Sequence, residues 1–313
     1  MYLAVSAKLI LNLHDLNNER AEEIRRIPLI YELNDSYEFV EEAVAVSGVM
    51  LKHWHLAYMV ALGKGRVNFC ENCVKLEGVR VRSGEKGSES EFIKKCVGED
   101  VHGFLRAQPV LRRESLIKFS WLLPCMLEEV YREIGTTTPF RVLQHSRNVR
   151  TPKEKRQEQM LYPRAYASGL YGFTSLVDLG NVGFSFTEQK QVLEKEEVKE
   201  RRRLTVEAFA PMITGAFGAS LARALPVAKP VEIICVVSSK PLPAPVHPIY
   251  NNSYELNVKL YKGIAELFGS TVTINVWGRE VKEVKENFFK VRSVDEPAAV
   301  FTRVIEDLGL GAK

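Results

Sequence analysis

The sequence contains no long uncharged apolar stretch. A membrane-spanning helix needs about 18 or more consecutive apolar residues, and no such run occurs in the 313 residues. The first residues, MYLAVSAKLILNLHDL, contain neither a basic leader nor a small-residue cleavage site. We therefore expect a cytoplasmic protein that does not associate with membranes.

The common signatures of catalysis are also missing. The glycines form neither the GxGxxG pattern of dinucleotide-binding folds nor the GxxxxGK[ST] pattern of P-loops, so nucleotide hydrolysis lacks its usual motif. No GxSxG elbow, HExxH helix or DxD-like metal cluster is present. We expect no cofactor and consider binding before catalysis.

Cysteine is scarce, and its number is odd. Five cysteines argue against the paired framework of a secreted disulfide protein. Cys70 and Cys73 form a CxxC motif, which is half of a typical zinc site. Further ligands could come from Cys96, His102, His53 or His55. A local disulfide or free thiols are the alternatives, so the sequence leaves the metal unassigned.

Length and composition predict a globular protein with a substantial core. The chain is 46% hydrophobic, which suffices for one large domain or two smaller ones. Lysine and arginine number 43 against 39 aspartate and glutamate, for a net charge of +4. This small excess permits an anionic partner without requiring one, so the clustering of charge matters more than its total.

Hydrophobic periodicity predicts a mixture of strands and helices. Strands are expected at residues 3–12, 27–31, 37–46, 116–123, 168–180, 231–237 and 271–276. Helices are expected at residues 49–62, 194–212, 254–268 and 296–308. Two regions are expected to be irregular: residues 63–98, which look like an insertion, and residues 135–167, apart from a short strand at 140–143.

One turn between a strand and a helix has the character of an anion site. Ser47 and Gly48 precede an apolar helix whose strongly polar side chains, Lys52, His53 and His55, all lie in its first two turns. Free N–H groups at a helix start, a glycine that allows close approach and a neighbouring lysine suit a phosphate. In the alternative interpretation the serine is only a cap and the lysine is a solvated charge.

A polar segment follows the strand expected at 140–143. Residues 147–159, RNVRTPKEKRQEQ, are too polar for a core and predict an excursion that projects from the body. His145, at its base, could hydrogen-bond along a bound RNA strand or act as a general acid or base. Cleavage would need a partner such as His14, so a metal-independent endoribonuclease is the alternative to simple binding.

Phosphate-seeking groups recur at separate points of the chain. They are Lys52 with His53, Arg112 with Arg113, His145 with Arg147, and Arg223 near Gly215 and Gly218. Apolar and aromatic side chains flank several of them, and such groups can stack on bases or wedge between them. For each residue taken alone, a core aromatic or a solvated cation is the alternative.

Seven ordered motifs resemble one known family. They are LNLHDLN (11–17), VSGVMLKHWH (46–55), EDVHGFL (99–105), RRESLIKFSWLLP (112–124), HSRN (145–148), ASGLYGF (167–173) and GASLARALP (218–226). This order resembles the DevR-type autoregulator family, the backbone subunit of archaeal type I-A CRISPR Cascade complexes. The resemblance spans about the first 250 residues, whereas the C-terminal helices match only in general character.

The resemblance implies a fold and a function. The fold would be α+β, with a modified ferredoxin-like (RRM-like) core that forms a single domain over 1–313, an inserted subdomain at 63–112 and a thumb excursion at 144–167. Copies of the subunit would polymerise along a guide RNA (crRNA) without cutting it. The guide would then pair with target DNA, and other Cascade subunits would be further partners.

The resemblance also implies RNA-facing residues. Ser47, Gly48, Lys52 and His53 would hold guide phosphates, and Asn12, His14 and Asn17 would lie near the RNA path at the end of the first strand. Gln144, His145 and Arg147 would form the base of the thumb, and Met160, Leu161 and Tyr162 are its wedge candidates. Gly215, Gly218, Ala219 and Arg223 would correspond to a glycine-rich loop that faces RNA. Arg112 and Arg113 complete the predicted interface on the strength of their charge.

Overall fold

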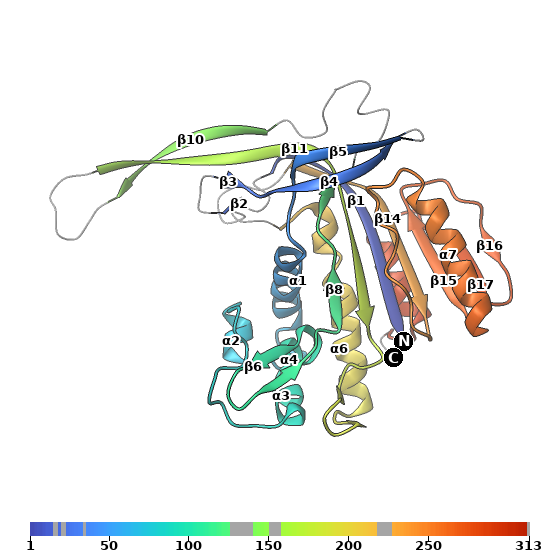
Figure 1. Cartoon of the computed structure of the whole chain (residues 1–313). Coiled ribbons are helices and arrows are strands. Elements are labelled where there is room, and N and C mark those ends of the chain that lie inside the picture. The colour runs from blue at the N-terminus through green and yellow to red at the C-terminus, as the bar shows by residue number, and fades with distance from the viewer. Residues whose placement is uncertain are drawn as a thin grey trace.

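A computed structural model describes residues 1–14, 18–19, 23–33, 36–125, 140–149, 158–217 and 227–311. Its centre is a mixed sheet with the order β10-β11-β1-β14-β15-β17-β16, and β8 and β9 also pair with β11 (Figure 1). The strands of this sheet are β1 (Tyr2–His14), β8 (Ile117–Phe119), β9 (Leu123–Pro124), β10 (Phe140–Val149), β11 (Glu158–Asp178), β14 (Val227–Ser238), β15 (Val272–Trp277), β16 (Val284–Lys285) and β17 (Phe289–Ser293). The chain is therefore an α+β protein.

The middle of the sheet is antiparallel. β1 lies between β11 and β14, with Val5 opposite Ser175 on one side and Cys235 on the other. β15 joins β14 in antiparallel pairing, while β15 and β17 run parallel. β8 and β9 pair with the edge of β11 that faces away from β1.

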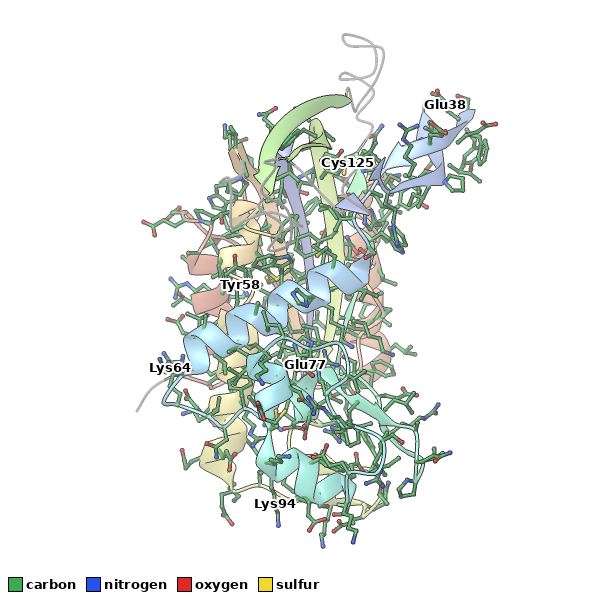
Figure 2. All side chains as sticks on the ribbon, turned by 90° about the vertical axis from the view of Figure 1, so that its left-hand side faces the viewer. Glu38, Tyr58, Lys64, Glu77, Lys94 and Cys125 are labelled. Carbon is green, nitrogen blue, oxygen red and sulfur yellow. The ribbon has the colours of Figure 1, made fainter. Side chains whose placement is uncertain are left out.

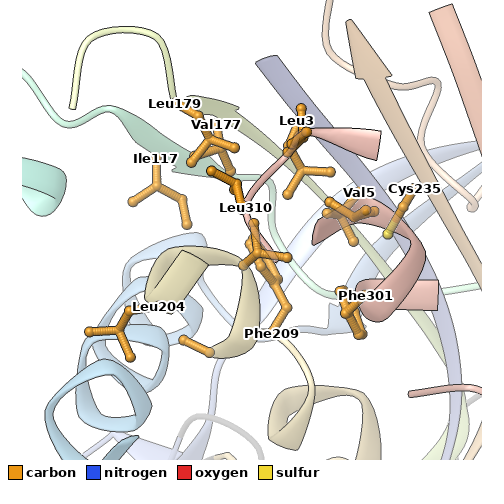
Figure 3. Packing of buried hydrophobic residues seen from close by; sticks show 14 of the residues in the cluster. Leu3, Val5, Ile117, Val177, Leu179, Leu204, Phe209, Cys235, Phe301 and Leu310 are labelled. Carbon is orange, nitrogen blue, oxygen red and sulfur yellow. The ribbon is translucent and has the colours of Figure 1, made fainter. Parts of the chain in front are cut away.

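Helices cover both faces of this sheet. α1 (Gly48–Gly63), α6 (Lys195–Glu207) and α8 (Ala299–Asp307) pack on one face, and α7 (Ser253–Phe268) packs on the other (Figure 1). Because side chains alternate along a strand, Leu3 and Val5 of β1 enter the core beneath α6 and α8, while Ala4 enters the α7 side. Phe209 and Phe301 stack within the larger core (Figure 3).

A two-stranded arm leaves the sheet where β1 ends. His14 of β1 and Phe140 of β10 both pair with Ala167, from opposite sides of β11. Beyond this point β10 is the one described strand that pairs with β11, down to the pair formed by Val149 and Glu158. The arm extends over the side of the molecule that holds α1 (Figure 1).

An inserted segment follows α1 and returns to the sheet at β8. It contains α2 (Glu71–Val74), α3 (Glu89–Lys95), α4 (Val97–His102), β6 (Phe104–Arg106) and β7 (Leu111–Arg113). In Figure 2 the labels Glu77 and Lys94 mark this insert below α1. The insert is thus ordered, with short helices that hydrophobic periodicity did not reveal.

Smaller elements complete the description. A separate hairpin precedes α1, and Glu38 marks it in Figure 2. The remaining pieces are β2 (Asn18–Glu19), β3 (Glu23–Ile24), β4 (Arg26–Leu33), β5 (Ser36–Val44), β12 (Phe184–Ser185), β13 (Lys190–Gln191) and the 3-10 helix η1 (Pro211–Thr214). None of the described helices is long and apolar enough to cross a lipid bilayer.

Most of the predicted elements are confirmed. The strand expected at 3–12 is β1, the helix expected at 49–62 is α1, and the two strands expected at 27–31 and 37–46 form the β4–β5 hairpin. The short strand expected at 140–143 is confirmed as the start of β10, but the interpretation of the rest of 135–167 as irregular is wrong for residues 144–149 and 158–167, which are strands paired in register. Their polar sequence has no alternating apolar pattern to reveal a strand.

Candidate nucleic-acid interface

Backbone hydrogen bonds to the sheet and a serine N-cap fix the start of α1, as the sequence predicted. Val46 exchanges backbone hydrogen bonds with Leu122, at 3.0 and 2.9 Å, so the chain enters the turn from the sheet. Ser47 is the N-cap, and its hydroxyl accepts a hydrogen bond from the Met50 N–H at 3.3 Å. The capping interpretation of Ser47 is therefore correct, and it leaves this hydroxyl already engaged.

Gly48 serves close packing within the protein. A Cβ at this position would lie 2.5 Å from the Phe119 carbonyl oxygen and 2.8 Å from the Ser120 carbonyl oxygen. The prediction attributed this glycine to the approach of a ligand, whereas the approaching backbone is the end of β8. Gly48 thus sets the position of α1 against the sheet edge.

A large open cleft lies between the start of α1 and β8. Its volume is about 990 Å³. The residues lining it are Arg25, Ser47, Gly48, Val49, Met50, Lys52, His53, Trp54, Ser115, Ile117, Lys118, Phe119 and Trp121. Among these described residues three are lysine or arginine and none is aspartate or glutamate, which favours an anionic ligand. We refer to this feature as the α1 cleft.

Two side chains of the α1 cleft have lowered pKa values because they are partly buried and lie near another cation. Burial, followed by the charge of Arg80, lowers the pKa of Lys52 to about 8. The same two causes lower the pKa of His53 below its ordinary value. An anion placed in the cleft would offset both effects, because it favours the charged form of each group.

Aromatic side chains accompany these cations. The Arg25 guanidinium lies over the Trp121 ring, 5.4 Å from its centroid. Trp54 lies edge-on to His53, and its buried indole N–H has no hydrogen-bond partner among the described residues. The cleft therefore combines cations with aromatic side chains, a combination that is common in sites for single-stranded nucleic acid. Figure 2 shows α1 from this side, running from Lys64 past Tyr58 toward the β4–β5 hairpin.

Arg112 lies in a second cavity that adjoins the first. This cavity has a volume of about 450 Å³ and shares Ser115 and Lys118 with the α1 cleft. Arg112 is exposed and forms an ion pair with Glu114 at 3.4 Å. Its position is compatible with the prediction that Arg112 and Lys52 lie along one path, with Lys118 between them.

Arg113 does not fit the prediction of an RNA contact. Its side chain is fully buried and forms ion pairs of 2.7 Å with both Glu89 and Asp100. The same Asp100 binds the buried Arg201 of α6 at 3.0 Å. Arg113 therefore ties β7 to α3, α4 and, through Asp100, to α6, and its charge is neutralised inside the protein.

Gly215 lies beside the end of β1. Its backbone has a φ of +72°, and a Cβ there would lie 2.6 Å from the Ala228 side chain and 2.8 Å from that of Leu11. Asn12, the next residue of β1, is exposed. Two residues predicted to face RNA are thus brought close in space, although Gly215 also has a packing reason to be glycine.

The other predicted residues are placed only in part. Asn17, Gly218, Ala219 and Arg223 lie outside the described residues. His14, Gln144, His145, Arg147, Met160, Leu161 and Tyr162 belong to strands whose backbone register is known but whose side chains are not described. All but His14 of this second set lie on the arm, where His145 pairs with Tyr162 and Arg147 with Met160.

The register separates the two histidines of the endoribonuclease hypothesis. His14 is opposite Ala167, and His145 is opposite Tyr162, which is five residues further along β11 and on its other side. At about 3.3 Å per residue this offset is roughly 16 Å along the strand. The backbone therefore does not place this acid and base side by side.

Two further histidines are structural. His55 is buried, and its Nδ1 lies 3.1 Å from His102 Nε2, while its Nε2 lies 3.0 Å from the Thr205 carbonyl oxygen. Burial lowers the pKa of His55 to about 4, so this imidazole is neutral. The suggestion that His53, His55 or His102 completes a metal site with the CxxC motif is not supported, because only Cys70, Cys73 and Cys96 converge among the described residues.

Three cations of the interface were missed in the sequence. Arg25 and Lys118 line the α1 cleft, and Arg80 acts on Lys52 and His53 from the insert. Lys118 lies within the motif RRESLIKFSWLLP, where its alternation with the buried Ile117 gave a usable signal of exposure. Arg25 lies 23 residues before the start of α1 and Arg80 lies 17 residues after its end, so only the fold shows that they are near it.

The sequence of this chain is similar to those of known CRISPR-associated proteins. Residues 5–258 match the family described as CRISPR-associated negative auto-regulator DevR/Csa2. A Methanocaldococcus jannaschii relative, named CRISPR-associated protein Cas7/Cst2/DevR, is 32% identical over 334 residues, covering 98% of this chain and 100% of the relative. A Saccharolobus solfataricus relative, named CRISPR-associated protein Cas7/Csa2 1, is 27% identical and covers 78% of this chain and 81% of its own length.

A solved structure shares the fold. One chain of a structure titled CRISPR RNA-guided surveillance complex superposes with a TM-score of 0.54 at 11% identity, covering 98% of this chain and 100% of the other. The family match extends over most of the sequence, and the 32% identity extends over nearly all of it. This chain therefore belongs to the DevR/Csa2 family of CRISPR-associated proteins, as its seven motifs predicted.

Proposed function

We propose that this protein is a guide-RNA-binding backbone subunit of an archaeal type I-A CRISPR interference complex. The observation that carries the proposal is the α1 cleft, in which Lys52, His53 and Lys118 line a space without acidic side chains among the described residues. Its volume of about 990 Å³ is large enough for a segment of ribose-phosphate chain with one or more bases. Phosphates bind such cations without regard to base sequence.

The strand order supports a modified ferredoxin-like, RRM-like core. The order β14-β1-β11-β8, with α1 between β1 and β8 in the sequence and α6 between β11 and β14, is the arrangement of a βαββαβ unit. In that unit the four strands are antiparallel to their neighbours, as they are here. The insert and the arm are then additions to a known RNA-binding framework.

The arm supports polymerisation. It reaches beyond the sheet on the side of α1 (Figure 1), where an identical subunit bound further along the same RNA could receive it. Repetition of one contact along a strand produces a helical filament when the operation does not close into a ring. In this proposal the bound guide pairs with target DNA, and other subunits of the complex cap the filament.

The proposed role is binding without cleavage. The backbone positions of His14 and His145 are separated along β11, and the buried His55 is neutral. Incubation with labelled repeat RNA tests this part of the proposal. Discrete products that disappear in a His145→Ala variant would overturn it in favour of the endoribonuclease.

Direct measurement of RNA affinity tests the α1 cleft. We expect the double variant Lys52→Ala, Lys118→Ala to bind labelled single-stranded RNA of mixed sequence more weakly than the wild type. The slope of log affinity against log salt should fall by about 0.7 for each lost phosphate contact. Fluorescence anisotropy over a series of salt concentrations gives both quantities.

The matched control is Lys64→Ala. Lys64 is an exposed lysine at the C-terminal end of the same helix, and it does not line the α1 cleft. This variant should keep the affinity and the salt slope of the wild type. Equal affinities for the double variant and the control would show that RNA does not use this cleft.

A further inference from the structure

Three cysteines of the insert converge on one point. The Sγ atoms of Cys70, Cys73 and Cys96 all lie within 4.8 Å of one another, and the three residues are buried. Cys70 caps α2, Cys73 lies within α2, and Cys96 stands between α3 and α4. Two separate segments of the insert therefore bring their thiols together.

The thiols are tightly enclosed. All three are free cysteines, and a disulfide between any two would leave the third without a partner. Leu56 and Val60 of α1 and Phe69 of the insert surround them. A Cβ on Gly98 would lie 2.6 Å from Cys73 Sγ, so the first turn of α4 presses directly against the cluster.

A buried carboxylate provides an independent indication of a ligand. Glu99 is 0% exposed, and neither of its carboxyl oxygens has a hydrogen bond of good geometry among the described residues, although the carboxyl interacts with the Cys70 thiol. It is the third residue of α4, the helix that begins after Cys96 at the N-cap. Burying an unpartnered carboxylate is costly, and native proteins rarely leave one without a bonded partner or a cation.

We propose that Cys70, Cys73 and Cys96 bind a Zn²⁺ ion, and that Glu99, which interacts with Cys70 but does not lie within 4.8 Å of all three thiols, turns onto the ion as the fourth ligand. Thiolates favour zinc among the common divalent cations, and the spacing Cys-x₂-Cys with a third, distant cysteine is typical of structural sites. Four protein ligands leave no open position for a substrate, so the ion has a structural role. Lys95, whose charge interacts with Glu99 and Cys70, offsets part of the negative charge of the ligands.

The three cysteines pack against α1, which indicates what a bound ion would stabilise. Leu56 and Val60 of α1 pack against the cysteines, so the ion would hold together the two segments of the insert that pack on the helix lining the α1 cleft. The buried ion pairs of Arg113 fasten the other end of the insert to α4 and α6. This site does not depend on the proposed RNA-binding function.

Metal content provides the first test. We expect the full chain, reconstituted with zinc under reducing conditions and passed over a desalting column, to retain one zinc ion per chain in elemental analysis. The variant Cys73→Ser should lose it. The matched control is Cys235→Ser, which makes the same change at another fully buried cysteine, in the core of the sheet, and it should retain the zinc.

Cobalt substitution keeps the proposal testable if Cys73→Ser fails to fold. The wild type loaded with Co²⁺ should show thiolate-to-cobalt charge-transfer absorption together with the visible bands of tetrahedral cobalt. The variant Glu99→Gln should keep the charge-transfer absorption but shift the visible bands and release zinc to a chelator more readily. A reconstituted wild type without zinc, or without charge transfer, would overturn the site, and an unchanged Glu99→Gln spectrum would remove Glu99 from it.

Discussion

At the scale of single residues, the sequence singled out two side chains that line the α1 cleft, and it misassigned one arginine that is buried. Lys52 and His53 were predicted from their place in the first turns of a helix, and both line the α1 cleft. Arg112 and Arg113 are adjacent and chemically identical, yet one is exposed and the other is wholly buried. The difference comes from Glu89 and Asp100, and their proximity to Arg113 is created by the folding of the insert.

The lowered pKa of Lys52 predicts a pH-dependent affinity for RNA. Its pKa is about 8 in the free protein because of burial and the charge of Arg80. Only the protonated amine attracts a phosphate, so affinity should be level up to about pH 7 and fall by up to about tenfold per pH unit above pH 8. Anisotropy with an all-adenine RNA between pH 7 and pH 9 measures this decline without titration of the bases.

Lys52→Arg is the control for this effect. A guanidinium stays charged over the whole range, so the affinity of this variant should remain level to pH 9. Burial and the charge of Arg80 lower the pKa of His53 below its ordinary value, so a decline in affinity above pH 8 does not come from this side chain. Identical pH profiles for the wild type and Lys52→Arg would mean that Lys52 does not contact the phosphate.

At the scale of elements, hydrophobic patterning located the parts that are buried on one face. α1, α7 and β1 were predicted nearly to their ends because each contributes apolar side chains to a core at regular spacing. The strands of the arm were missed, apart from residues 140–143. The reason is that the arm leaves the sheet beyond Ala167, where pairing with β10 alone holds β11 as a strand.

The junction between α1 and β8 predicts a specific sensitivity to substitution. Gly48→Ala would place a methyl group 2.5 Å from the Phe119 carbonyl oxygen, so the helix start or the strand end must shift. We expect a loss of about 1–3 kcal/mol in the free energy of unfolding and weaker RNA binding, since both elements line the α1 cleft. Urea denaturation followed by circular dichroism gives the stability.

Gly263→Ala is the matched control for Gly48→Ala. Gly263 lies within α7, and a Cβ there would meet nothing within 4 Å. Alanine should stabilise this helix by up to about 1 kcal/mol, because glycine is the poorer helix former. If both alanine variants unfold at the same urea concentration, Gly48 is not held by the backbone of β8.

At the scale of the whole molecule, the described residues form a body built on the central sheet, together with the insert and the arm. These two parts are held to the body in different ways. The insert is fixed to the body by buried charges at Arg113 and Arg201 and by the apolar surroundings of its cysteines. Among the described residues, the arm continues from the sheet through β11 and is held by its pairing with β10. Sequence patterning predicted the body, whereas the attachment of the insert depends on contacts between distant residues that no local pattern encodes.

Shortening the arm should separate binding from assembly. Replacement of residues 144–163 by an Asn-Gly turn would join Leu143 to Arg164, which already face one another in the β10–β11 register. The body should keep its melting temperature, because the pairing of β11 with β1 begins only at Ala167. The shortened protein should still bind a short RNA in the α1 cleft but should not form filaments on a long one.

Analytical ultracentrifugation and negative-stain electron microscopy with RNA measure assembly. Filaments of wild-type length from the shortened chain would show that neighbouring subunits do not meet through the arm, while the affinity for short RNA tests the α1 cleft independently.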